Sequence, residues 1–118
     1  MTTSPQIKSL ALRRMQELKD ESPEAQVTQE LLEDRAIVQV LLNNRVLETD
    51  FIESHRSCLL PRRTIEYYDV LGQGIKLGII VPDREVEGEK NRMKRVKGAN
   101  RFTVTGYDEA TGSGPAVI

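Results

Sequence analysis

Residues 36–42 read AIVQVLL, and whether this run is a helix or a strand decides the architecture of the first half of the chain. Its β-branched residues favour a strand by propensity. The run also belongs to a longer apolar series whose length and spacing are typical of a helix: Val27, Leu31, Val38, Leu41 and Leu42. We predict a helix from Ser22 to about Asn43 and leave open whether residues 36–42 form a strand instead.

Two Ser-Pro pairs, at Ser4 and Ser22, are typical of helix starts, because Ser caps a helix and Pro suits its first position. The first pair predicts a helix that ends near KDES, residues 19–22. One face of that helix is apolar and consists of Ile7, Leu10, Ala11, Met15 and Leu18.

A third, shorter helix is predicted after the polar turn in NNRVLETD, residues 43–50. Asp50 and Glu53 have the spacing of a capping box, in which two side chains satisfy backbone N–H groups at a helix start. The helix would run over Phe51 to about Ser57, and Pro61 would end the region.

Three runs in the second half are rich in β-formers: RTIEYYDVL (63–71), GIKLGIIVP (74–82) and NRFTVTGYD (100–108). GQG at 72–74 separates the first two runs and predicts a hairpin turn. Residues 83–101 are too many for a tight turn, so we expect them to extend the neighbouring strands into a long protruding hairpin.

These elements predict the α+β class: N-terminal helices, two long and one short, followed by a small antiparallel β-sheet with a long basic hairpin. A length of 118 residues indicates one domain, 1–118. Within it we expect a helical part (1–60), a β part (61–110) and a flexible tail (111–118).

Composition limits the classes of function. The net charge is −1 at pH 7, so any electrostatic function must be local. The single cysteine, Cys58, excludes an internal disulfide, and no Cys/His cluster suits zinc, so no metal or cofactor is expected. The N-terminus does not resemble a signal peptide and no apolar run is long enough to span a membrane, which predicts a cytoplasmic protein.

The basic run KNRMKRVKGANR (90–101) is the main candidate binding site. It holds six cations and no carboxylate: Lys90, Arg92, Lys94, Arg95, Lys97 and Arg101. In the expected hairpin, Asp83, Glu85, Glu87 and Glu89 would neutralise some of this charge across the strands. With Arg84 counted, seven cations face four carboxylates, and the surplus suits phosphate contacts.

His55 and Cys58 are spaced as neighbours on a helix, as a nucleophile and its base would be. No third residue is evident to orient the imidazole, and Cys58 beside Leu59 and Leu60 is typical of a small buried apolar residue. We therefore predict that the protein is not an enzyme.

The sequence favours a small non-catalytic binding protein that contacts nucleic acid, or a nucleoprotein or transcription complex, through the basic hairpin. The alternative is a structural or assembly adaptor subunit of a larger protein particle, suggested by the aromatic-poor core and the projecting hairpin. A protein partner fits either interpretation, and no small-molecule substrate is indicated.

Overall fold

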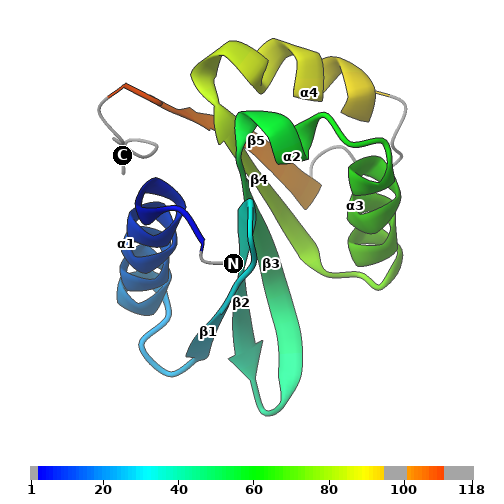
Figure 1. The fold of residues 1–118 in the computed structure, drawn as a ribbon. Coiled ribbons are helices and arrows are strands. Elements are labelled where there is room, and N and C mark those ends of the chain that lie inside the picture. The colour runs from blue at the N-terminus through cyan, green and yellow to red at the C-terminus, as the bar shows by residue number, and fades with distance from the viewer. Residues whose placement is uncertain (1–2, 95–100, 111–118) are drawn as a thin grey trace.

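A computed structural model describes residues 3–94 and 101–110, which form a five-stranded mixed sheet with helices on both faces (Figure 1). In chain order the elements are α1 (Pro5–Glu21), β1 (Gln26–Leu31), β2 (Arg35–Leu42), β3 (Arg45–Glu53), α2 (His55–Cys58), α3 (Arg62–Gly72), β4 (Lys76–Pro82), the 3-10 turn η1 (Asp83–Glu85), α4 (Val86–Met93) and β5 (Phe102–Tyr107). The α+β class is confirmed, whereas the three predicted helices and the antiparallel sheet match only in part.

The strands lie in the order β1-β2-β3-β4-β5. The first three form an antiparallel meander, and the β3–β4 and β4–β5 pairs are parallel. Parallel neighbours need a crossover connection rather than a hairpin. Helices α2 and α3 provide the first crossover, and η1 with α4 lies in the second.

Residues 36–42 are strand, so the predicted helix from Ser22 to Asn43 is wrong. Their burial alternates with period two: Ala36, Val38 and Val40 are buried, whereas Ile37 and Gln39 are half-buried on the opposite face. The apolar series that suggested one helix therefore spans two paired strands, β1 and β2.

The turn between β2 and β3 explains why this region folds as a meander. Asn43 and Asn44 both have positive φ angles, 53° and 63°. Consecutive positive φ values are typical of the two-residue hairpin turn that matches strand twist, and Asn tolerates them better than most residues.

The first helix is confirmed as α1. The Ser4 hydroxyl accepts a hydrogen bond from the Ile7 N–H at 3.2 Å, and Pro5 occupies the first turn, where its missing N–H matters little. The predicted apolar face is the packed one, with Ile7, Leu10, Ala11 and Leu18 buried and Met15 packed partly against them.

The third helix, predicted to run from Asp50 to about Ser57, begins later in the sequence, as α2. Asp50 and Glu53 lie buried in β3 rather than at a helix start. The short helix α2 is capped instead by Ser54, which exchanges two 2.9 Å hydrogen bonds with Ser57. The capping box therefore exists, but it uses two serines in place of the carboxylates.

The predicted strand 63–71 is the helix α3. Its Ile and Tyr residues have high strand propensity, but tertiary packing decides: Tyr67 is fully buried, and Val70 and Leu71, three and four residues later, pack beside it. GQG is consequently not a hairpin turn. Gly72 is the last residue of α3, and Gly74, at φ 79°, lies in the link to β4, which confirms the strand predicted at 74–82.

The long hairpin at 83–101 is also wrong, because residues 83–93 form η1 and α4. Residues 95–100 lie outside the described residues, as does the tail 111–118. The strand predicted at 100–108 is confirmed as β5. Strands β1, β2 and β3 thus lie within the predicted helical part (1–60), and helices α3 and α4 lie within the predicted β part (61–110).

The sheet separates two apolar cores. One lies between the sheet and α1 and includes Leu10, Val38 and Ile52; the other lies against α2, α3 and α4 and includes Phe51, Tyr67 and Met93. Helix α1 packs on β1, β2 and β3, whereas α3 and α4 pack chiefly on β4 and β5. The helices on the second face are therefore displaced from β1 and β2, as Figure 1 shows.

Candidate binding surfaces

Helix α4 explains much of the charge segregation in residues 83–101. Carboxylates occupy η1 and the first turn of α4, and Lys90 and Arg92 occupy its last turn. Negative side chains near a helix N-terminus and positive ones near its C-terminus both stabilise the helix through its dipole. The pattern that suggested a binding site therefore has a structural cause.

The predicted site residues differ in how far they are neutralised. Arg92 pairs with Glu89 at 3.3 Å, and Lys90 approaches Glu87 at 4.0 Å. Lys94, at the end of α4, and Arg101, just before β5, are exposed and have no acidic partner within 4.0 Å in the described part of the chain. Arg95 and Lys97 lie outside the described residues.

The arginines around α2 and α3 are split between interior and surface. Arg63 is held by Glu66 at 2.7 Å and donates to the Ser57 carbonyl at 3.2 Å. Arg56 and Arg62 are exposed, and neither has an acidic partner within 4.0 Å among residues 3–94 and 101–110. These two cations remain available at the surface.

His55 and Cys58 are not arranged as a catalytic pair. The Cys58 thiol is directed at the His55 carbonyl oxygen at 3.3 Å, while His55 Nδ1 lies 3.2 Å from Glu85 Oε1. Burial, followed by the charges of Glu85 and Glu89, raises the pKa of Cys58 to about 12. A thiol with that pKa is protonated at neutral pH and is a poor nucleophile.

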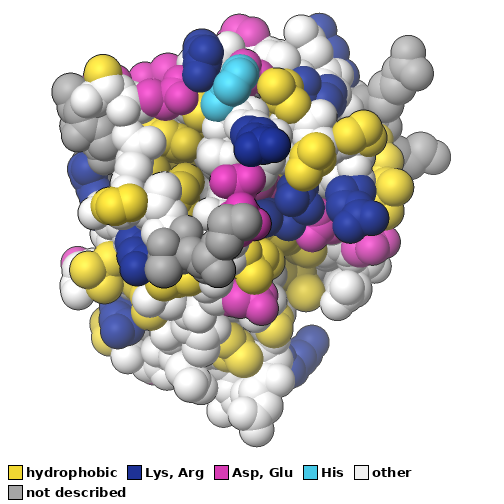
Figure 2. Space-filling view, in the orientation of Figure 1, with side chains coloured by type: hydrophobic (Ala, Val, Ile, Leu, Met, Phe, Trp, Pro, Cys, Tyr) yellow, Lys and Arg dark blue, Asp and Glu magenta, His cyan; other side chains and the backbone are white. Residues whose placement is uncertain are grey.

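Large apolar side chains are exposed around α2 and α3. Ile65 and Tyr68 are three residues apart on the outer face of α3, and Leu59 and Leu60 lie in the link that precedes it. We call Leu59, Leu60, Ile65 and Tyr68 the α2–α3 patch. Figure 2 shows hydrophobic side chains beside Lys and Arg over this region, which contains the exposed Arg56 and Arg62.

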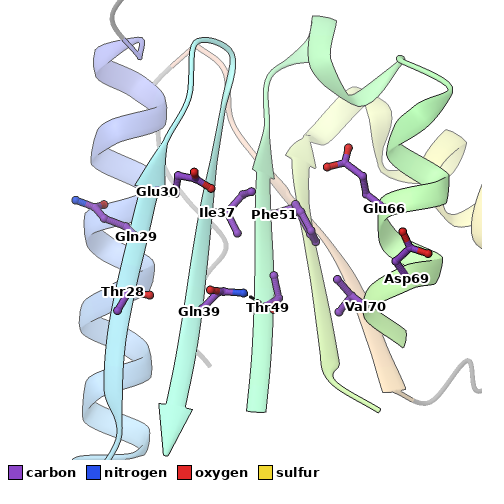
Figure 3. A pocket seen from close by; sticks show the side chains of 10 residues that line it. All are labelled: Thr28, Gln29, Glu30, Ile37, Gln39, Thr49, Phe51, Glu66, Asp69 and Val70. Carbon is purple, nitrogen blue, oxygen red and sulfur yellow. Dashed lines mark hydrogen bonds between the residues drawn. The ribbon is translucent and has the colours of Figure 1, made fainter. Parts of the chain in front are cut away.

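A groove of about 490 Å³ lies beside α3, over the part of the sheet that the helices leave open (Figure 3). Ile37, Phe51 and Val70 supply apolar surface, and Gln39 and Thr49 add polar groups from β2 and β3. The Gln39 amide is drawn toward Thr49, donating to its hydroxyl at 3.3 Å.

Three carboxylates border the groove: Glu30 from β1, and Glu66 and Asp69 from α3 (Figure 3). Burial alone would raise the pKa of Glu66, but hydrogen bonds from Arg63 and Arg35 outweigh it and lower that pKa below its ordinary value. Glu66 is thus ionised, and Arg35 and Arg63 neutralise its charge. Glu30 and Asp69 have no cationic partner within 4.0 Å in the described ranges.

Glu53 is a buried hub that sequence reasoning missed. Its carboxylate accepts from Arg35 at 2.6 Å, Tyr67 at 2.5 Å and Ser57 at 2.8 Å, and its backbone carbonyl accepts from Tyr107 at 2.8 Å. These bonds join β2, β3, α2, α3 and β5. No local motif signals the hub, because its members are distant in sequence.

A second buried cluster lies on the opposite face of β3. Arg14 of α1 contacts Asp50 at 2.6 Å, Glu17 at 3.0 Å and Glu48 at 3.2 Å. Asp50 Oδ1 is buried without a hydrogen-bond partner in the part of the chain described. Burial and the neighbouring Glu48 raise the pKa of Asp50 to about 7, although Arg14 acts to lower it.

The fold and these surfaces define a mixed-sheet α+β protein with a cationic apolar patch and an acid-bordered groove. No protein family, curated protein or solved structure that was compared matches the chain. Within residues 3–94 and 101–110, no group of three or more His, Cys, Asp or Glu side chains is placed to hold a metal ion. No described helix has both the length and the apolar character required to cross a membrane.

Proposed function

We propose that the protein is a non-catalytic adaptor, acting in the cytoplasm, that docks an acidic amphipathic segment of a protein partner on the α2–α3 patch. The observation that carries the proposal is that one short segment, residues 56–68, holds four exposed large apolar side chains and two exposed arginines, Arg56 and Arg62, that lack acidic partners among the described residues.

Charge complementarity selects the kind of partner. An apolar stripe on a partner helix would cover Ile65 and Tyr68, while carboxylates beside that stripe would meet the two arginines. Arginine and aromatic side chains are also the residues that most often dominate binding energy in protein interfaces. The patch therefore fits an acidic amphipathic helix better than a basic one.

The test is a titration with two synthetic helical peptides that share one apolar stripe, one carrying Glu and the other Lys beside it. We expect the acidic peptide to bind with the tighter dissociation constant and to shift amide NMR signals of α2 and α3. Ile65→Glu should weaken this binding at least about tenfold. Leu12→Glu is the matched control, because Leu12 on α1 is 65% exposed and Ile65 is 63% exposed.

Equal binding of the two peptides, or equal loss in the two variants, would overturn the proposal. Light scattering across a range of concentrations adds an independent reading. A stable dimer that Ile65→Glu dissociates would assign the patch to a second copy of this chain instead.

Contact with nucleic acid or a nucleoprotein complex is a second candidate, supported by the exposed Lys94 and Arg101, which have no acidic partner within 4.0 Å among the described residues. Because phosphate contacts release counterions, binding to an oligonucleotide should weaken with salt, and Lys94→Ala should reduce that salt dependence by about one unit of slope. Lys8→Ala, on the exposed side of α1, is the control. Affinity that does not change with salt excludes this candidate.

A further inference from the structure

We propose that the groove between α3 and the β1–β2 hairpin binds a small apolar organic cation, an amine or guanidine carried on an aromatic or alkyl body. The site uses Glu30, Asp69, Gln39 and the apolar surface of Phe51 and Val70. It is separate from the α2–α3 patch and does not depend on the proposed adaptor function.

The size and lining of the groove favour a small ligand. Its volume of about 490 Å³ falls in the range of ordinary ligand sites, roughly 300–1,000 Å³. Phe51 and Ile37 lie along the sheet and Val70 faces them from α3, as Figure 3 shows. An apolar body placed there would cover the half-buried side chains of Ile37 and Val70, which is favourable in proportion to the apolar area removed from water.

The charged side chains around the groove determine whether it favours a cationic or an anionic ligand. Arg35 and Arg63 are both engaged with Glu53 and Glu66, so two cations balance two carboxylates within this network. Glu30 and Asp69 then remain without a cationic partner in the described part of the chain. A cation bound between α3 and β1 would be attracted by both carboxylates.

Gln39, a neutral polar residue of β2 in the groove, has the same preference. Gln39 donates its amide hydrogen to Thr49 Oγ1 at 3.3 Å, which leaves the Gln39 carbonyl oxygen as an acceptor. No donor to that oxygen is present among residues 3–94 and 101–110. Carboxylate and amide acceptors beside apolar surface match an N–H donor on an apolar body.

The test compares three probes with one apolar body and different charges: 2-phenylethylamine, 2-phenylethanol and 3-phenylpropionate. Binding is followed by amide NMR shifts in the full chain. We expect the amine to bind with a millimolar dissociation constant, to shift signals of β2, β3 and α3, and to bind about tenfold more tightly than the alcohol. The carboxylate should bind more weakly still.

Variants separate the site from general attraction to an acidic surface. Asp69→Asn should weaken amine binding several-fold and leave alcohol binding unchanged, whereas Glu87→Gln, an exposed carboxylate on α4, should change neither. Unchanged thermal unfolding will show that the variants remain folded. Equal affinity for all three probes, shifts outside the groove, absence of amine binding, or unchanged amine binding in Asp69→Asn would overturn the proposal.

Discussion

Strand β3 carries buried carboxylates on both faces, and the two faces treat them differently. Glu53 faces α3, where Arg35, Tyr67 and Ser57 donate hydrogen bonds to both of its oxygens. Asp50 faces α1, where Arg14 binds one oxygen and the other has no partner among the described residues. Two carboxylates on one strand thus differ, because both oxygens of Glu53 accept hydrogen bonds and only one oxygen of Asp50 does.

The comparison shows that two equally buried carboxylates can differ in their surroundings, because the number of hydrogen-bond donors around each one differs. Both side chains are almost completely inaccessible to solvent. The Glu53 carboxylate has a hydrogen-bond donor for each oxygen, and one of those donors is the cation Arg35. Asp50 shares the single cation Arg14 with Glu17 and Glu48, and its second oxygen has no hydrogen-bond partner in the described part of the chain.

The largest expected effect is that of Glu53→Ala. Removing this carboxylate leaves Arg35 buried without its 2.6 Å partner and also frees the Tyr67 and Ser57 hydroxyls. Breaking a buried ion pair by removing one partner costs about 3–5 kcal/mol. We expect a loss of that order in the free energy of unfolding, measured by urea denaturation, or complete loss of cooperative unfolding.

The exposed Glu87→Ala is the control and should change stability by less than about 0.5 kcal/mol. A Glu53→Ala variant that lost under about 1 kcal/mol would mean that the hub adds little beyond packing.

A smaller effect is expected from Gly78→Ala, which tests how tightly the chain packs around Asp50. A Cβ at Gly78 of β4 would collide with Asp50 Oδ1, and the Asp50 side chain is fixed by Arg14. Overpacking of a core costs about 1–3 kcal/mol. We expect that loss by urea denaturation, with partial recovery when Asp50→Ser shortens the opposing side chain.

Gly72→Ala is the matched control, because a Cβ at Gly72 meets no other atom within 4 Å. If Gly78→Ala destabilises equally with Asp50 and with Ser at position 50, the collision is not the cause and the two sites are independent.

The sequence predicted the elements whose signals are local. The Ser4 cap and the apolar face of α1 identified that helix, and the strand-forming run before Pro82 identified β4. It failed at residues 22–43, where two paired strands imitate one helix, and at 63–71, where Ile65 and the tyrosines have strand propensity but pack as a helix. Tertiary contacts overrode propensity in each case.

The candidate sites depended even more on contacts between distant residues. The cationic character of 90–101 was visible, but the helix that arranges Lys90 and Arg92 beside their acids was not. The groove joins β1, β2, β3 and α3, which become neighbours only once the sheet order is known. Sequence spacing carries no information about such a surface.

The smallest effect expected is a pH dependence of stability that distinguishes the two faces of β3. Because the pKa of Asp50 is raised from 3.8 to about 7, the folded state holds a proton there that the unfolded state has already lost. Stability from this group is complete below about pH 4 and falls as the pH rises toward 7. Glu66, whose pKa is lowered, has the opposite pH dependence: its contribution to stability is present at neutral pH and is lost in acid.

Urea denaturation at pH 5 and pH 8 measures the contribution of Asp50. We expect the chain to lose at least about 1 kcal/mol across this interval, since each unit of pKa shift corresponds to about 1.4 kcal/mol. Asp50→Asn should remove most of that slope, even though the raised pKa of Glu89 adds a slope of the same sign in both proteins. Parallel pH profiles for the chain and for Asp50→Asn would show that Asp50 is ionised in the fold at both pH values, and that Arg14 is sufficient to stabilise its charge.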